Sequence, residues 1–348
     1  MSFVSFFNKK RTDSIVLIDI GATSVAGAYV RYTPGEQPTI IHTRRLPVEV
    51  RGGEPKGQAM IRALKVLGDD LLHDGAPILV HESGSGKIDG ILVAIDAPWQ
   101  KTTVHTEQFE QNMPFTFTQH LVLAALEKSN VVPEGQVLAD ESIIGTILNG
   151  YETRDPYGKQ AHRASISILT SYINERITKE IYAILRSLYH TKNITFIASS
   201  SLRYQAMRTV FPHERDALFL DAIGLLTFIA LVRRGLLADI VETGIVRATH
   251  FTAWLKEVTV EFTKLAERFP LPRTIFLLAH EQDASSFKDA LGKTNFGTLW
   301  LSDNPPKIVS VLGSHMSGLV RQTTSTPPDL SLLLMTLYYQ HHKVEDTL

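Results

Sequence analysis

The chain has 348 residues, enough for about two domains or one domain with a large insertion, and its 44% hydrophobic and 20% charged content excludes a wholly disordered, collagen-like or coiled-coil protein. Its 35 Lys and Arg residues balance 36 Asp and Glu residues, so the net charge of -1 gives no general reason to expect a nucleic-acid partner. The absence of cysteine excludes disulfides and thiolate chemistry and fits a reducing compartment.

The N-terminal segment combines aromatic and basic side chains. Three phenylalanines precede three cations, which is the reverse of the order in a secretory signal, so we expect a cytoplasmic protein. A frayed chain end is the simpler interpretation of this segment, and contact with an anionic membrane surface is the alternative. No run approaches the roughly 20 apolar residues of a membrane-spanning helix. The residues concerned are Phe3, Phe6, Phe7, Lys9, Lys10 and Arg11.

The part of the chain up to residue 98 predicts three strands, a crossover helix and a fourth strand. A glycine turn separates the first two strands, and Pro34-Gly35 marks the turn before the third. Apolar residues then recur with a helical period, and a Gly- and Ser-rich loop at 81–89 precedes the last strand. The strands are expected at 15–20, 25–32, 39–46 and 90–97, and the helix at 57–73.

The segment from 99 to 190 mixes strands and helices and is interpreted as an inserted subdomain. After it, a strand at 193–200 and a helix at 202–210 return to the first pattern. The opening pattern of strand, glycine turn and strand then recurs, which indicates an internal duplication without close sequence identity. In the inserted segment we expect helices at 117–128 and 174–189 and strands at 135–138 and 164–169. In the second half we expect strands at 217–221, 228–233, 244–251 and 273–279 and helices at 254–268, 285–291 and 328–341.

The turn between the first two strands is the first candidate site. Backbone amides of a tight glycine turn at Gly21 and the hydroxyls of Thr23 and Ser24 suit a phosphate oxygen. Asp19, near the end of the buried strand, could hold a magnesium ion through water. The alternative is a plain hairpin in which Gly21 supplies a positive φ and Asp19 caps the turn. The 13 histidines show no metal-ligand spacing.

The stretch Ile15-Val-Leu-Ile-Asp-Ile-Gly-Ala-Thr-Ser-Val-Ala26 resembles the first phosphate motif of the actin, Hsp70 and sugar-kinase superfamily, and more narrowly of its FtsA and PilM branch. The turn at 149–158 looks like the one inside the FtsA insert. The resemblance implies an α/β protein with a duplicated actin-like (ribonuclease H-like) fold and an SHS2-like α+β insert. The implied parts are a first half at 1–98, the insert at 99–190, the return of the first half at 191–215, a second half at 216–316 and a C-terminal segment at 317–348.

The other nucleotide motifs of the superfamily depart from the expected pattern. Gly224 and Thr227 keep the spacing of the second phosphate motif, but Asp221 stands one residue early, which turns a strand side chain to the other face. The stretch 279–282, where the superfamily places two glycines beside the adenosine, contains none, and only glycine permits close backbone approach there. The resemblance therefore implies binding of ATP and magnesium that is weak or lost, with no catalytic residue identified and at most weak ATPase activity.

Three functions remain open on this basis. The first is a PilM-like scaffold of a type IV pilus or related secretion machine, which docks on the cytosolic segment of an inner-membrane protein and receives it as an extended peptide. The second is an FtsA-like division protein that binds a tubulin-like filament. The third is a sugar or acetate kinase, which would require intact phosphate turns and a catalytic carboxylate. Self-association of the chain is left open in all three.

Overall fold

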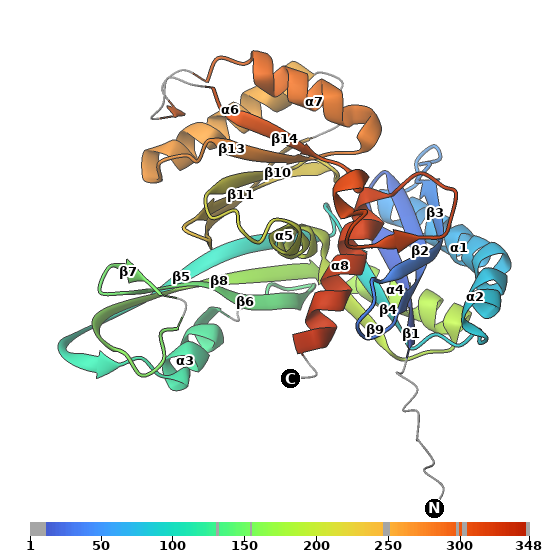
Figure 1. The fold of residues 1–348 in the computed structure, drawn as a ribbon, viewed down its shortest axis with the longest axis horizontal. Coiled ribbons are helices and arrows are strands. Elements are labelled where there is room, and N and C mark those ends of the chain that lie inside the picture. The colour runs from blue at the N-terminus through green and yellow to red at the C-terminus, as the bar shows by residue number, and fades with distance from the viewer. Residues whose placement is uncertain are drawn as a thin grey trace, which may run out of the picture.

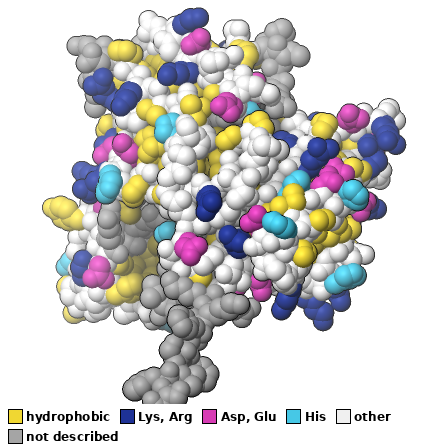
Figure 2. Space-filling view, turned by 45° about the vertical axis from the view of Figure 1, so that its right-hand side comes forward, with side chains coloured by type: hydrophobic (Ala, Val, Ile, Leu, Met, Phe, Trp, Pro, Cys, Tyr) yellow, Lys and Arg dark blue, Asp and Glu magenta, His cyan; other side chains and the backbone are white. Residues whose placement is uncertain are grey.

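The structure is a computed structural model that describes residues 12–129, 132–153, 155–245, 251–296, 299–300 and 305–345 (Figure 1). The aromatic and basic residues at the N-terminus, Phe3 to Arg11, lie outside the described residues. No helix in the described part of the chain is both long and apolar enough to span a membrane. On the face drawn in Figure 2, basic and acidic side chains are interspersed, as expected for a net charge near zero.

A six-stranded sheet forms the first half of the molecule. Its central strand β1 is fully buried, pairs antiparallel with β2 and pairs parallel with β4. The strand order is β15-β3-β2-β1-β4-β9. The strands are β1 (Asp13–Ile20), β2 (Ser24–Tyr32), β3 (Thr39–Pro47), β4 (Gly90–Ile95), β9 (Ile194–Ala198) and β15 (Arg321–Gln322).

Helices cover both faces of this sheet. On one face α1 (Lys56–Asp70) continues through a π-helical turn (Leu71–Gly75) into α2 (Ala76–Ser83), where we expected a helix ending at 73 and a loop from 81. The apolar side of α1 and three isoleucine and leucine side chains of α4 (Glu175–Tyr189) share a core with β1 and β4. On the other face lie α5 (Ser199–Val210) and α8 (Leu330–Glu345), and α8 runs beside the sheet between the halves (Figure 1).

A four-stranded sheet occupies the middle of the sequence. Its order is β5-β8-β6-β7, and α3 (Gln119–Ser129) packs on its small core around Phe117. The edge strand β5 was not expected, because 100–116 is mostly polar and exposed and so lacks the apolar alternation that marks a half-buried strand. The strands are β5 (Gln100–Thr116), β6 (Gln136–Leu148), β7 (Tyr151–Glu152) and β8 (Gln160–Asn174).

The second half repeats the topology of the first. Its sheet has the order β12-β11-β10-β13-β14, which matches β3-β2-β1-β4-β9 strand for strand and confirms the predicted duplication. The strand expected at 244–251 overlaps only the end of β12, which begins at Leu236 directly after a turn at Arg234-Gly235. Residue 251 is helical, and 246–250 lie outside the described residues. The strands are β10 (Ala217–Asp221), β11 (Leu226–Arg233), β12 (Leu236–Ile245), β13 (Thr274–Leu278) and β14 (Lys307–Val311), with helices α6 (Phe251–Arg268) and α7 (Glu281–Lys293).

Candidate functional site

A cleft of about 730 Å³ lies between the two halves. Its walls come from the β1–β2 turn and β3 on one side and from the β13–α7 connection and the end of β14 on the other, and the loop before α8 closes it. The structure therefore places the first candidate turn and the stretch 279–282 around one cavity. Arg45 is the only Lys or Arg among the described residues that line it.

The first turn presents its hydroxyl residues to this cleft. The backbone N–H of Gly21 donates to the carbonyl oxygen of Ser24 at 2.9 Å, and the carbonyl of Thr23 accepts from Val48 at 2.8 Å, so the turn is tied at both ends. Gly21 is not among the residues with a positive φ, so the turn does not need glycine for that reason. Thr23 and Ser24 both line the cleft.

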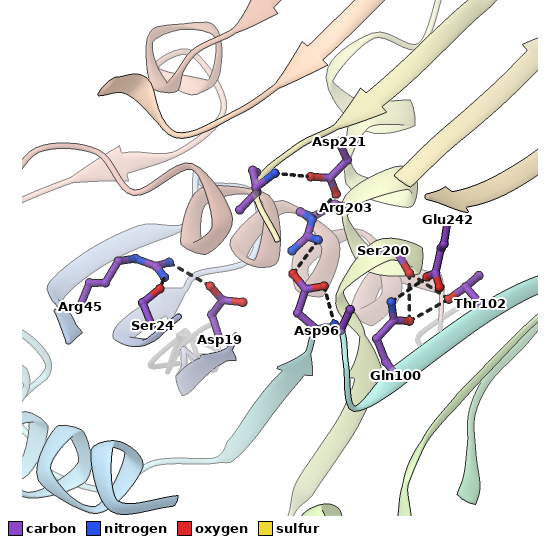
Figure 3. A network of polar contacts seen from close by, with 12 residues as sticks. Asp19, Ser24, Arg45, Asp96, Gln100, Thr102, Ser200, Arg203, Asp221 and Glu242 are labelled. Carbon is purple, nitrogen blue, oxygen red and sulfur yellow. Dashed lines mark hydrogen bonds and ion pairs between the residues drawn. The ribbon is translucent and has the colours of Figure 1, made fainter. Parts of the chain in front are cut away.

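Arg45 of β3 lines the cleft and binds two residues at this turn. Its Nη2 donates to Asp19 Oδ2 at 2.9 Å and its Nη1 donates to Ser24 Oγ at 2.7 Å (Figure 3). Its Nε and Nη2 also donate to the two carboxylate oxygens of Asp329, at 2.6 and 3.0 Å. Burial alone would lower the pKa of Arg45, but the carboxylates of Asp329 and Asp19 raise it instead. The carboxylate predicted to hold magnesium therefore faces a guanidinium.

Asp329 stands at the N-terminus of α8 and so joins the C-terminal segment to the first turn. Its Oδ1 accepts from the backbone N–H of Leu332 at 3.2 Å, which satisfies a free donor of the first helical turn. Burial alone would raise the pKa of Asp329, but Arg45 lowers it. Arg45 in the cleft is thus paired with a carboxylate of the same chain, that of Asp329.

A second arginine, Arg203 of α5, holds the two halves together. Its Nη2 donates to Asp96 Oδ2 of the first half at 2.9 Å, and its Nε donates to Asp221 at the end of β10 in the second half (Figure 3). All three side chains are buried. Each carboxylate also accepts a backbone N–H, that of Ala97 at 2.7 Å and that of Ile223 at 3.0 Å. Asp221 therefore serves an ion pair between the halves and does not line the cleft.

The two residues predicted on the second turn also lie away from the cleft lining. A methyl group built on Gly224 would stand 2.4 Å from Asp96 Oδ2, so the turn packs directly on that carboxylate. Thr227 is fully buried, and its hydroxyl accepts a hydrogen bond from Trp254 Nε1 at 2.7 Å. The structure thus brings Thr23 and Ser24 to the cleft, ties Asp19 to it through Arg45, and uses Gly224 and Thr227 for packing.

Gly224→Ala is expected to destabilise the protein by about 2 kcal/mol, because the added methyl group overlaps the Asp96 carboxylate that Arg203 holds. Urea unfolding would measure the change. Gly292→Ala in α7 is the matched control, since a methyl group there meets nothing within 4 Å and alanine favours a helix, so its effect should be neutral or stabilising. An equal change in the free energy of unfolding for both substitutions would contradict the close packing of Gly224 on the Asp96 carboxylate.

The cleft does not suit a magnesium–nucleotide complex. A triphosphate requires cations that can be turned toward it, but Arg45 already contacts two carboxylates. On the opposite wall, 279–282 reads Ala-His-Glu-Gln, so side chains stand where glycines would admit the adenosine. Across the described part of the chain no three His, Asp or Glu residues form a group that could hold a metal ion.

A third polar cluster joins the four-stranded sheet to both halves. Gln100 Nε2 of β5 donates to Glu242 Oε1 of β12 at 2.7 Å. The side-chain Oε1 of Gln100 accepts hydrogen bonds from the hydroxyls of Thr102 and Ser200, at 3.0 and 3.1 Å (Figure 3). Burial raises the pKa of Glu242 to about 7, and the hydrogen bond from Gln100 only partly opposes it. This cluster was not predicted, because it joins residues 142 positions apart in the sequence.

The comparisons with known proteins agree with the fold. No protein-family model matches the chain, and no curated protein matches it either. A solved structure of the PilM–PilN type IV pilus biogenesis complex is similar at 14% identity and a TM-score of 0.56, covering 94% of this chain and 98% of that one. A Bacteroides thetaiotaomicron protein with an actin-like ATPase fold has 8% identity, a TM-score of 0.42 and coverages of 96% and 99%. The cytoplasmic domain of EpsL, an inner-membrane component of the type II secretion system of Vibrio cholerae, has 7% identity, a TM-score of 0.39 and coverages of 94% and 90%.

The repeated strand order and the likeness to the pilus complex along nearly the whole chain show that this chain has the duplicated actin-like fold that the sequence predicted. At 14% identity the likeness establishes the fold alone.

Proposed function

We propose that the chain is an actin-like scaffold of a type IV pilus or related secretion assembly machine, which binds the cytosolic segment of an inner-membrane protein at the cytoplasmic face of that membrane. The observation that carries this proposal is the likeness to the PilM–PilN complex, because it covers 94% of this chain and 98% of that one and so includes the four-stranded sheet as well as both halves. Fold similarity alone leaves function open, so the site must support the role independently.

The ion pairs between the halves favour a scaffold over a nucleotide-driven enzyme. In a nucleotide-driven protein of this fold, phosphates between the two turns would hold the halves together. Here Arg203 links Asp96 to Asp221 across the halves, and Arg45 links the first turn to Asp329. Ligand-independent closure suits a protein that presents a fixed surface to a partner. The same contacts argue against a sugar or acetate kinase, which requires phosphate turns open to ATP.

The docking role can be tested with a synthetic peptide that has the cytosolic segment of the PilN counterpart from the same organism. Calorimetric titration into the full chain should give saturable binding in the micromolar range, unchanged by ATP and magnesium. A scrambled peptide of the same composition is the control. Assembly of the chain into filaments on lipid vesicles, with no binding of the segment, would instead support the FtsA-like alternative.

The chain is expected to bind magnesium–ATP weakly or not at all, because Asp19 and Asp329 already occupy the donors of Arg45. Calorimetric titration should show no saturable heat below about 1 mM ATP, and ATP should leave the melting temperature unchanged. Micromolar binding that disappears in Asp19→Ala would contradict this expectation and would show that the first turn still binds phosphate.

A further inference from the structure

A second groove of about 430 Å³ continues the cleft toward the edge of the first sheet. The two cavities adjoin, since both are lined by Glu281, Gly313 and Pro328. The second groove has an apolar floor of buried Met316, Val320 and Leu333. Because it is bordered by β15, we call it the β15 groove.

The strand beside this groove is an open sheet edge. β15 pairs on one side with β3, through hydrogen bonds from Arg321 N to Pro38 O at 2.9 Å and from Thr323 N to Ile40 O at 3.0 Å. Since backbone groups alternate along a strand, the N–H and C=O of Gln322 between them point to the other side, where no further strand of the described residues lies. An extended chain could pair there.

Two polar side chains of the groove lack partners among the described residues. The side-chain nitrogen of Gln322 is buried without a hydrogen-bond acceptor, which carries a desolvation cost of about 1–3 kcal/mol. The carboxylate of Glu281, at the junction of the two cavities, has no hydrogen bond or ion pair within the described part of the chain. A carbonyl oxygen of a ligand would satisfy the buried Gln322 nitrogen, and a positive charge on the ligand would pair with the exposed carboxylate of Glu281.

We propose that the β15 groove binds an extended peptide segment of a partner protein, which adds to the outer edge of β15, places an apolar side chain on Met316, Val320 and Leu333, and places a basic side chain beside Glu281. Strand addition supplies the backbone hydrogen bonds, and the groove supplies the side-chain selection. A peptide fits this set of groups better than a nucleotide, because the groove offers an unpaired carboxylate where a phosphate would be repelled. The inference does not rest on the proposed pilus or secretion role.

The test uses the full chain and fluorescently labelled synthetic peptides of about nine residues, with alternating Thr and Val, a central Leu, and either Lys or Glu two positions from it. Fluorescence anisotropy should show the Lys peptides binding at least about tenfold more tightly than the Glu peptides. Glu281→Arg should reverse this preference. Ser317→Trp, at an exposed residue lining the groove, should block both peptides while leaving the melting temperature unchanged.

Glu257→Arg, at an exposed glutamate of α6 away from the groove, is the matched control and should leave the preference as in the wild type. The proposal would be overturned if neither peptide binds, if binding survives Ser317→Trp, or if Glu281→Arg and Glu257→Arg change the preference equally. Displacement of the bound Lys peptide by added ATP would also overturn the proposal. Failure of the PilN-type segment to bind would leave these outcomes unaffected, so the two proposals fail separately.

Discussion

Replacing Arg203 by methionine is expected to lower the free energy of unfolding by about 3–5 kcal/mol, because two buried carboxylates then lose their common counter-ion. Asp96 and Asp221 would each keep one backbone N–H donor, at 2.7 and 3.0 Å, which is too little to stabilise two charges shielded from water. Urea unfolding, followed both by far-UV circular dichroism and by tryptophan fluorescence, would measure the loss and show whether the halves still unfold together.

The matched control is Arg176→Met, which removes an exposed ion pair with Glu180 in α4 and should cost less than about 1 kcal/mol. The double variant Arg203→Met with Asp221→Asn should recover part of the loss, because one uncompensated charge is removed with the arginine. A loss in Arg203→Met no larger than that of the control would mean that the ion pair does not hold the halves together. Hydrogen exchange at 222–227 would locate the effect, since Asp221 holds that turn through Ile223.

The sequence predicted the first hairpin and the duplication well, because both depend on local signals. β1 contains a run of four apolar residues, 15–18, and is followed by a glycine turn; similar signals return at β10. β5 was missed because most of its side chains are polar and exposed, and most of β12, which begins at Leu236, was not predicted as a strand. These strands are defined by the neighbours they pair with, which a local window does not contain.

The site was only half predictable for a similar reason. The hydroxyl turn at Thr23 and Ser24 is contiguous in sequence, whereas Arg45 and Arg203 stand in a strand and a helix without any motif. A signal did exist: Asp19, Asp96 and Asp221 each stand at the carboxyl end of a buried strand. Three acids at neighbouring strand ends require cations, and a search for arginines in otherwise buried segments could have found them.

The partly buried Glu242 is expected to make stability depend on pH in a direction opposite to that of most carboxylates. Its pKa of about 7 in the folded protein lies above the ordinary value of 4.5, so the folded state retains this proton where the unfolded chain has lost it. The free energy of unfolding therefore falls as the pH rises from about 4.5 to about 7, by at most about 3 kcal/mol from this group. The charged groups that face Glu242 are Asp96, which raises its pKa, and Lys101, which lowers it.

Glu242→Gln keeps an acceptor for Gln100 and removes the titration, so the variant should match the wild type near pH 4.5 and be more stable than it by up to about 3 kcal/mol at pH 8. Urea unfolding of both proteins across this range would measure the difference. The exposed Glu257→Gln should show none. A difference for Glu242→Gln that is the same at pH 5 and pH 8 would mean that Glu242 titrates normally. A stability difference that grows as the pH rises would show that the contact between Gln100 of the four-stranded sheet and Glu242 of the second half stabilises the protein most when Glu242 is protonated.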